Sequence, residues 1–228
     1  MDILCITHAE FETAGIIETW AQDAGHDFVN HRPYCGESLP TADHFDMLII
    51  MGGPQSPLKL DEFPYLADEM KLIKEAIAAH KKVIGFCLGA QLIGEALGAK
   101  TERSPEKEIG VYPITLTDEA QHDHLLEGLP KELPVIHWHN DMPGLTSDSI
   151  LLAFSAGCPR QIIRYKPLVY GFQCHLEITL PGMKDLIDHV PGDLKTSKYT
   201  QTKDELIAQD YASINHTMIE ILNRFVGL

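Results

Sequence analysis

Hydrophobic residues in the first hundred positions follow two patterns that alternate along the chain. Short runs that are apolar almost throughout are typical of strands buried on both faces of a sheet, and they span 2–7, 46–51 and 82–86, with a weaker strand signal over 26–30. Longer stretches carry apolar residues at helical spacing, and they span 11–24, 64–80 and 88–97. Gly25 and Gly98 follow two of these stretches as helix stops. This alternation predicts an α/β fold with a mainly parallel sheet covered by helices on both faces.

The pattern changes after Gly98. Short strand-like runs joined by turns now follow one another, over 109–117, 135–138, 150–156, 161–165 and 168–173, and they predict an antiparallel or mixed extension of the sheet. A last stretch with helical spacing spans 197–228, whereas 181–202 is rich in Gly, Pro, Lys, Ser and Thr and is predicted to be mobile. We expect one domain over residues 1–228, with a core to about 180 and a C-terminal helical extension over about 197–228.

Composition and charge narrow the classes of partner. The chain has 228 residues and a formal net charge of −15 at pH 7, which makes nucleic acids and anionic membranes poor partners. No apolar run is long enough to span a bilayer, and Asp2 stands where a signal peptide would carry a basic residue, so we expect a cytoplasmic protein. Five scattered cysteines without a CxxC pair indicate reduced thiols rather than a disulfide framework.

Cys87 is the most distinctive residue, because it lies between a predicted strand and a predicted helix with Gly85 and Gly89 on either side. Glycines let the backbone pack closely around a residue held in a rarely populated conformation, and such a turn lifts the side chain into a cleft. The start of the helix directs free N–H groups and a positive dipole end toward the sulfur, which favours the reactive thiolate. The alternative is an inert buried thiol, which is how we interpret the other four cysteines.

The start of the same helix offers the N–H of Leu88 to a developing oxyanion. Gly52, Gly53 and Pro54 follow another parallel strand, and parallel strands bring such loops to one edge of the sheet. We therefore predict that Gly53 supplies a second N–H donor. The loop lacks the GxxxxGK[ST] pattern, so no nucleotide site is predicted there, and no cofactor is expected.

A histidine and a carboxylate follow the last predicted strand. His175 and Glu177 are two residues apart, so in an extended chain their side chains point to the same side. The carboxylate could then hold one ring nitrogen and leave the other for the sulfur of Cys87. Both residue types usually lie on the surface, but a thiol, an imidazole and a carboxylate at the ends of regular elements are the parts of a nucleophilic catalyst.

Three motifs together resemble the class I, or triad-type, glutamine amidotransferases. Along the chain they are Gly52-Gly53-Pro54, Gly85-Phe86-Cys87-Leu88-Gly89-Ala90-Gln91 and Gln173-x-His175-x-Glu177. This is the order that the family has. The likeness runs to about Thr179 and is closest to stand-alone members similar to the amidotransferase domain of GMP synthetase. It implies a flavodoxin-like, three-layer α/β/α fold and hydrolysis of the γ-carboxamide of glutamine or of a γ-glutamyl compound.

The resemblance also implies a role for each motif residue. The catalytic residues would be Cys87, His175 and Glu177, the oxyanion donors Gly53 and Leu88, and the substrate-binding residues Gly52, Gln91 and His139. The family usually has Phe-His-Pro-Glu where this chain has Cys174-His175-Leu176-Glu177. The loss of the proline removes a rigid turn, and Cys174 adds an unexpected thiol beside the base.

Several functions stay open at this point. A glutaminase subunit would pass ammonia to a synthetase partner, whereas a γ-glutamyl peptidase or hydrolase would act alone. A catalytically silent binding module on the same fold is the alternative that the changes at Cys174 and Leu176 motivate. Another cysteine hydrolase, such as a dienelactone-hydrolase-like enzyme, is disfavoured because that fold places the acid before the histidine.

His137, His139 and Asp141 alternate along a predicted strand and would share one face, which is how an HxHxD metal site could begin. We favour the simpler interpretation, a polar strand face that closes the active-site cleft, and predict no metal. The residues 122–124 and the charged run 102–108 are both predicted to be solvated loops.

Overall fold

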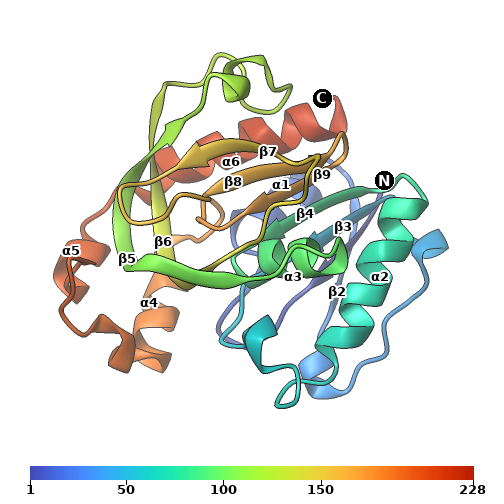
Figure 1. Ribbon diagram of the computed structural model, residues 1–228, viewed down its shortest axis with the longest axis horizontal. Helices are drawn as coiled ribbons and strands as arrows, with labels where there is room; N and C mark the ends of the chain where they lie inside the picture. The colour runs from blue at the N-terminus through green and yellow to red at the C-terminus, as the bar shows by residue number, and fades with distance from the viewer.

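The computed structural model describes residues 1–228 and shows a ten-stranded mixed sheet between two layers of helices (Figure 1). The strands are β1 (Asp2–Ile6), β2 (Asp27–His31), β3 (Met47–Ile50), β4 (Lys82–Phe86), β5 (Glu102–Leu116), β6 (Glu132–Met142), β7 (Ile150–Phe154), β8 (Ile162–Lys166), β9 (Val169–Phe172) and β10 (Tyr199–Thr200). The helices are α1 (Ile16–Asp23), α2 (Leu66–Ala78), α3 (Leu88–Ala96), α4 (Leu180–His189), α5 (Lys203–Ile207) and α6 (Tyr211–Val226). None of these helices has both the length and the apolar character needed to cross a bilayer.

The parallel half of the sheet holds five strands in the order β2-β1-β3-β4-β9. Alternate residues of β1, β3, β4 and β9 enter two separate hydrophobic clusters, whereas β2 at the edge is largely exposed. Ile3 and Cys5 of β1 belong to the cluster that includes α1 and α6, whereas Leu4 and Ile6 belong to the one that includes α2 and α3. Burial on both faces explains the unbroken apolar runs of the sequence. The predicted α/β/α fold is confirmed.

The other half of the sheet is antiparallel, in the order β9-β8-β7-β5, with β6 paired to β5, which confirms the predicted extension. The prediction of a charged loop over 102–108 is wrong, because these residues begin the long strand β5. The backbone at residues 102, 103 and 108 pairs with β6, and the charged side chains find partners on β6 and on other parts of the chain. Arg103, for example, lies opposite Asp141 and donates to its carboxylate at 2.8 Å.

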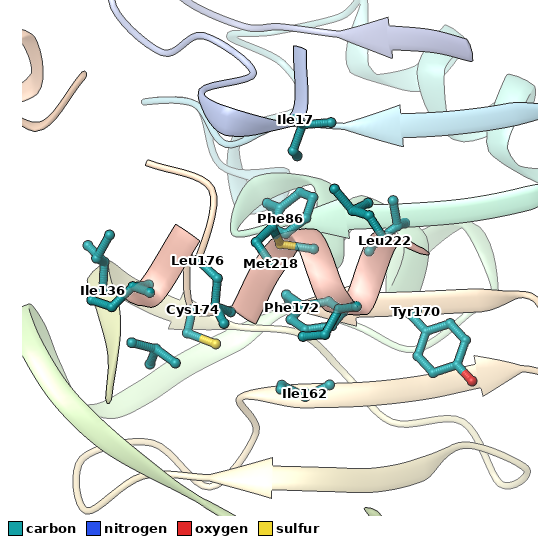
Figure 2. Packing of buried hydrophobic residues seen from close by; sticks show 14 of the residues in the cluster. Ile17, Phe86, Ile136, Ile162, Tyr170, Phe172, Cys174, Leu176, Met218 and Leu222 are labelled. Carbon is teal, nitrogen blue, oxygen red and sulfur yellow. The ribbon is translucent and has the colours of Figure 1, made fainter. Parts of the chain in front are cut away.

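Helix α6 packs beneath the strands whose carboxyl ends carry the predicted catalytic residues. Its side chains Met218 and Leu222 lie beside the aromatic pair Phe86 and Phe172, whose ring centres are 5.6 Å apart (Figure 2). Phe86 ends β4, Phe172 ends β9, and the two are register partners. The C-terminal segment is therefore largely helical, as predicted. Its separation from a core that ends at about residue 180 stays a prediction.

Two further boundaries differ from the sequence predictions. Helix α1 begins at Ile16 and not at residue 11, because the chain approaches the backbone of Glu177 at Gly15, where φ is 56° and a Cβ would lie 2.1 Å from a carbonyl oxygen. The segment predicted to be mobile, 181–202, includes most of α4, a 3-10 helix at Pro191–Leu194 and β10. Pro181 and Gly182 lie in the first turn of α4, and the side chain of Thr179 caps that helix by accepting the N–H of Gly182.

The prediction of a solvated loop over 122–124 is wrong for Asp123, although His124 is exposed. Asp123 is buried, and its carboxylate accepts hydrogen bonds from the guanidinium of Arg164 at 2.7 Å and from the hydroxyl of Tyr170 at 3.2 Å. A buried carboxylate is tolerated only when it is paired in this way.

We expect Met218→Ala to lower the free energy of unfolding by about 2–5 kcal/mol, because it leaves a cavity under the two phenylalanines. Urea denaturation measures the change. His216→Ala, at an exposed position of the same helix, is the control and should change stability by less than about 0.5 kcal/mol. Equal losses in the two variants would contradict the packing role of Met218.

Candidate active site

Cys87 lies in a strained turn between β4 and α3. Its φ of 49° is a left-handed conformation that non-glycine residues rarely adopt. A Cβ added at Gly85 would lie 2.5 Å from the carbonyl of Gly89, and one added at Gly89 would lie 2.1 Å from the carbonyl oxygen of Ile50. Close backbone approach therefore requires both glycines, as the sequence analysis expected.

A pocket of about 290 Å³ lies at the carboxyl ends of the parallel strands. Six predicted site residues share its lining: Gly53, Cys87, Leu88, Gln91, His139 and His175. Gly52 adjoins it, and a Cβ added there would lie 3.5 Å from Cβ of Cys87 and 3.3 Å from Cε1 of His175. The thiol and the imidazole thus lie on the same side of the sheet. Glu177 lies behind the imidazole, in a smaller neighbouring pocket.

The carboxylate of Glu177 holds the imidazole of His175. Nδ1 of His175 lies 2.6 Å from one carboxylate oxygen, and both side chains are buried. The other carboxylate oxygen accepts the backbone N–H of Leu176 at 3.0 Å. A proline, which the family usually has at this position, has no N–H to donate. The change to leucine therefore replaces a rigid turn with a hydrogen bond that directs Glu177 at the imidazole.

The base loop, residues 173–178, is fixed by parts of the chain that are distant in sequence. It is not an extended strand, since β9 ends at Phe172. His175 exchanges two backbone hydrogen bonds with Ile136 of β6, at 2.8 and 2.9 Å. The buried amide of Asn215, on α6, donates to the two carbonyls on either side of Glu177, at 2.8 and 3.0 Å. No sequence motif marked Asn215, because its contact depends on how α6 packs.

The backbone N–H groups of Gly53 and Leu88 are free to bind an anion. Leu88 is the first residue of α3, so its N–H has no acceptor within the helix. The N–H of Gly53 makes no hydrogen bond within the protein. Both residues line the pocket with Cys87. Two unpaired donors beside a thiol are the arrangement that an oxyanion hole would need.

The charges around His175 favour its protonated form. Burial by itself would lower the pKa of His175, but the carboxylate of Glu177 and the sulfur of Cys87 together raise it well above its ordinary value. A raised imidazole pKa is what a thiolate–imidazolium pair requires. The sulfur of Cys87 also lies 3.8 Å from the carbonyl oxygen of Trp138.

Glu12 adds a carboxylate to this pocket that no sequence motif marked. It lines the pocket together with Cys87 and His175. Burial raises the pKa of Glu12, and the nearby His175 and His8 oppose that effect. Its place after β1, at the same edge of the sheet as the other loops, is the one signal that could have identified it.

Cys174 is no rival to Cys87 as a nucleophile. Its side chain is fully buried in the hydrophobic core, beside Leu176 (Figure 2). Burial raises the pKa of Cys174 well above its ordinary value, and it also raises the pKa values of Cys5 and Cys158. The unexpected thiol is thus a packing residue.

Glu108, His137 and His139 could hold a metal ion, because their ligand atoms lie within 4.8 Å of one another. The amide nitrogen of Gln161 lies among them, 2.8 Å from the carboxylate and 3.2 Å from each imidazole. Burial, with a contribution from His139, lowers the pKa of His137 to about 3, so this ring is neutral and can accept a hydrogen bond. The residues therefore form a buried polar network centred on the amide nitrogen of Gln161, in which Nδ1 of His139 and the amide oxygen of Gln161 have no partner.

Asp141 does not join that network, so the three residues of the HxHxD pattern, His137, His139 and Asp141, do not meet at one point. Its carboxylate accepts hydrogen bonds from the hydroxyl of Ser56 at 3.0 Å and from Arg103 at the rim of the pocket. Gln91 donates its side-chain amide to Gln173 at 3.0 Å. Contact of Gln91 or His139 with a substrate stays a prediction.

The chain belongs to the class I glutamine amidotransferase family. The family model described as "Glutamine amidotransferase class-I" matches residues 28–187, which is more than half of the chain. The matched segment includes Cys87, His175 and Glu177. The resemblance drawn from the sequence motifs is thereby confirmed at the level of the family.

Relatives and a solved structure agree with this assignment. The glutamine amidotransferase-like protein YfeJ of Salmonella typhimurium is 46% identical over 230 residues, which cover 98% of this chain and 96% of that protein. The glutamine-hydrolyzing GMP synthase of Thermosipho africanus is 31% identical over 142 residues, which cover 61% of this chain and 26% of that enzyme. The crystal structure of a glutamine amidotransferase from Thermotoga maritima covers 100% of this chain and 99% of its own, with a TM-score of 0.90 at 24% identity, and shows the shared fold.

Brief treatment with iodoacetamide near neutral pH should alkylate Cys87 and the exposed Cys35, and leave Cys174 unmodified. The reason is that burial both shields the thiol of Cys174 and raises its pKa. Peptide mass spectrometry of the folded protein measures the three sites separately. Alkylation of Cys174 at the rate of Cys87 would contradict this account.

Proposed function

We propose that this protein is an amidohydrolase of the glutamine amidotransferase type. The thiolate of Cys87 attacks the γ-carboxamide carbon of glutamine or of a γ-glutamyl compound. The negative charge that develops on the carbonyl oxygen is stabilised by the N–H groups of Gly53 and Leu88. His175, as the imidazolium, gives its proton to the leaving nitrogen, so that ammonia or an amine departs and a thioester remains on Cys87.

Hydrolysis of the thioester completes the cycle. Neutral His175 takes a proton from water, and the resulting hydroxide attacks the thioester carbon. The second tetrahedral intermediate breaks its bond to sulfur and releases a glutamyl carboxylic acid, which gives its proton to the solvent, and the thiolate and the imidazolium are restored. Glu177 keeps the same ring nitrogen protonated and the ring oriented throughout.

One observation carries the proposal: the strained turn at Cys87 and the His175–Glu177 pair, at 2.6 Å, meet at one pocket beside two free backbone N–H groups. The Leu176 N–H that holds Glu177 counts against a catalytically silent module, because the altered motif keeps the imidazole oriented. Membership of the family supports glutamine as the substrate class.

Two versions of this function differ in what receives the amine. A glutaminase subunit would pass ammonia to a synthetase partner, as the resemblance to the amidotransferase domain of GMP synthetase suggests. A γ-glutamyl peptidase or hydrolase would release a free amine and act without a partner. The cytoplasmic location that the sequence predicts stays a prediction.

The purified protein alone should release glutamate from glutamine or from γ-glutamyl dipeptides, and Cys87→Ala should abolish this release because it removes the nucleophile. Coupled detection of glutamate, with the two substrates run side by side, measures both activities. Turnover of dipeptides far above glutamine supports the self-sufficient hydrolase. Absence of turnover, combined with failure of a glutamine-like electrophile to label Cys87, would overturn the proposal.

We expect Glu177→Gln to lower kcat by about 10²–10⁴-fold, because the imidazole loses the partner that holds its orientation and charge. The substitution removes the group that raises the pKa of His175, so that pKa should fall. The alkaline limit of kcat/KM, which reports loss of the imidazolium that protonates the leaving nitrogen, should then move to lower pH. Glu119→Gln, at an exposed position, is the control. An unchanged pH profile would argue against the role of Glu177.

A further inference from the structure

His8 is a buried imidazole whose two ring nitrogens both face hydrogen-bond acceptors. Nδ1 lies 3.0 Å from the carbonyl oxygen of Gly52, and Nε2 lies 2.8 Å from a carboxylate oxygen of Glu69 on α2. A neutral imidazole has only one N–H, whereas the cation has two. With Glu69 ionised, both acceptors are satisfied only when His8 is charged. Neither side chain of this ion pair is exposed at all.

Such a pair is an expensive way to fill the interior. Taking two charges out of water costs several kcal/mol per ion, and apolar residues of the same volume often serve stability as well. We therefore look for the role of the His8–Glu69 pair in the groups that it holds in place, and not in stability. Within the proposed active site, the ring of His8 contacts the carbonyl of Gly52, at the start of the oxyanion loop (residues 52–54).

Peptide geometry carries the orientation from His8 to the pocket. The chain contains no cis peptide bond, so the N–H of Gly53 points away from the carbonyl of Gly52 across a rigid plane. That carbonyl is directed inward, to His8. The N–H of Gly53 is therefore directed away from His8, and Gly53 lines the pocket that Cys87 also lines.

The oxyanion loop lies tightly on His8, which makes the contact rigid. A Cβ added at Gly53 would lie 2.5 Å from Cβ of His8 and 2.4 Å from the side-chain oxygen of Gln55. The amide of Gln55 also donates to the backbone carbonyl of His8 at 2.9 Å. Two hydrogen bonds and close packing thus join the oxyanion loop and the adjacent Gln55 to His8, two residues after β1.

We propose that His8, kept as a cation by Glu69, is a positioning residue that directs the N–H of Gly53 at the oxyanion of the reaction. The inference rests on the proposed function, because it assigns His8 a task within that chemistry. His8 itself touches neither the substrate nor the reacting atoms. The His8–Glu69 pair fixes the plane of the Gly52–Gly53 peptide, and this plane directs the N–H of Gly53 into the pocket.

The charge of His8 depends on the groups that face it. These are Glu69 from α2 and Glu12 from the loop after β1. Burial would lower the pKa of His8, but Glu69 outweighs it, and Glu12 adds to that effect, so the pKa is raised. The contact is complete below the ordinary pKa and is lost as the pH rises through the raised one. The carboxylate, as the charged acceptor, should then keep the last N–H and leave Gly52 without a donor.

Two substitutions separate positioning from packing. His8→Gln removes the two N–H donors of the charged imidazole. We expect kcat for γ-glutamyl p-nitroanilide to fall at least about 10-fold. Complete loss of an oxyanion donor would lower it by about 10²–10³-fold. KM should change by less than about 3-fold. Alkylation of Cys87 by iodoacetamide should be unchanged, because this displacement develops no oxyanion.

Glu69→Gln should rescue the geometry. Without the carboxylate, neutral His8 can keep its proton on Nδ1 and donate to Gly52, while Nε2 accepts from the new amide. We expect kcat within about 3-fold of the wild-type value. Nitrogen-15 NMR of the His8 ring should show both nitrogens protonated in the wild-type protein at pH 7 and one in Glu69→Gln. His216→Gln, at an exposed position on α6, is the control for both assays.

The outcomes distinguish the inference from the proposed function. If the wild-type protein hydrolyses no glutamyl substrate, the proposed function fails and this inference fails with it. If the wild-type protein is active, a normal kcat in folded His8→Gln overturns the inference alone. Parallel losses of kcat and of Cys87 alkylation would show a structural role instead. If His8→Gln does not fold, a neutral His8 ring in the wild-type spectrum, or a Glu69→Gln variant as inactive as Cys87→Ala, overturns it.

Discussion

The proposed chemistry depends on the close contact between three pieces of backbone at the end of the parallel sheet. Gly85 lies against Gly89, and Gly89 lies against the carbonyl of Ile50, so that β4, α3 and β3 meet without side chains between them. This contact holds Cys87 at a φ of 49° and places its sulfur beside the start of a helix. The strain at one residue is offset by the packing of the whole sheet.

Hydrogen bonds from distant elements position the other parts of the site. The base loop is held by β6 through Ile136 and by α6 through Asn215, and the oxyanion loop is held by the His8–Glu69 pair. Each anchor is buried, so water does not compete with it. A pocket whose donors are fixed in advance needs little reorganisation as charge develops, which is the main electrostatic advantage of an enzyme site.

The sequence predicted the fold from its apolar pattern, because strands buried on both faces and helices buried on one leave distinct periodicities. It also indicated Cys87, His175, Glu177, Gly53 and Leu88, because each follows a recognisable strand end or helix start. It failed where tertiary pairing overrides composition: the charged run 102–108 forms a strand because β6 lies beside it, and Asp123 is buried because Arg164 and Tyr170 reach it. Asn215 could not be foreseen, since a helical asparagine carries no local signal of a contact with a loop 37 residues away.

The most direct test of this account is acid quenching of the protein during turnover of glutamine or of a γ-glutamyl substrate, followed by peptide mass spectrometry. The account predicts a glutamyl thioester on the peptide that contains Cys87 and none on the peptide that contains Cys174. Glutamate release without any adduct on Cys87, or an adduct on another thiol, would contradict it.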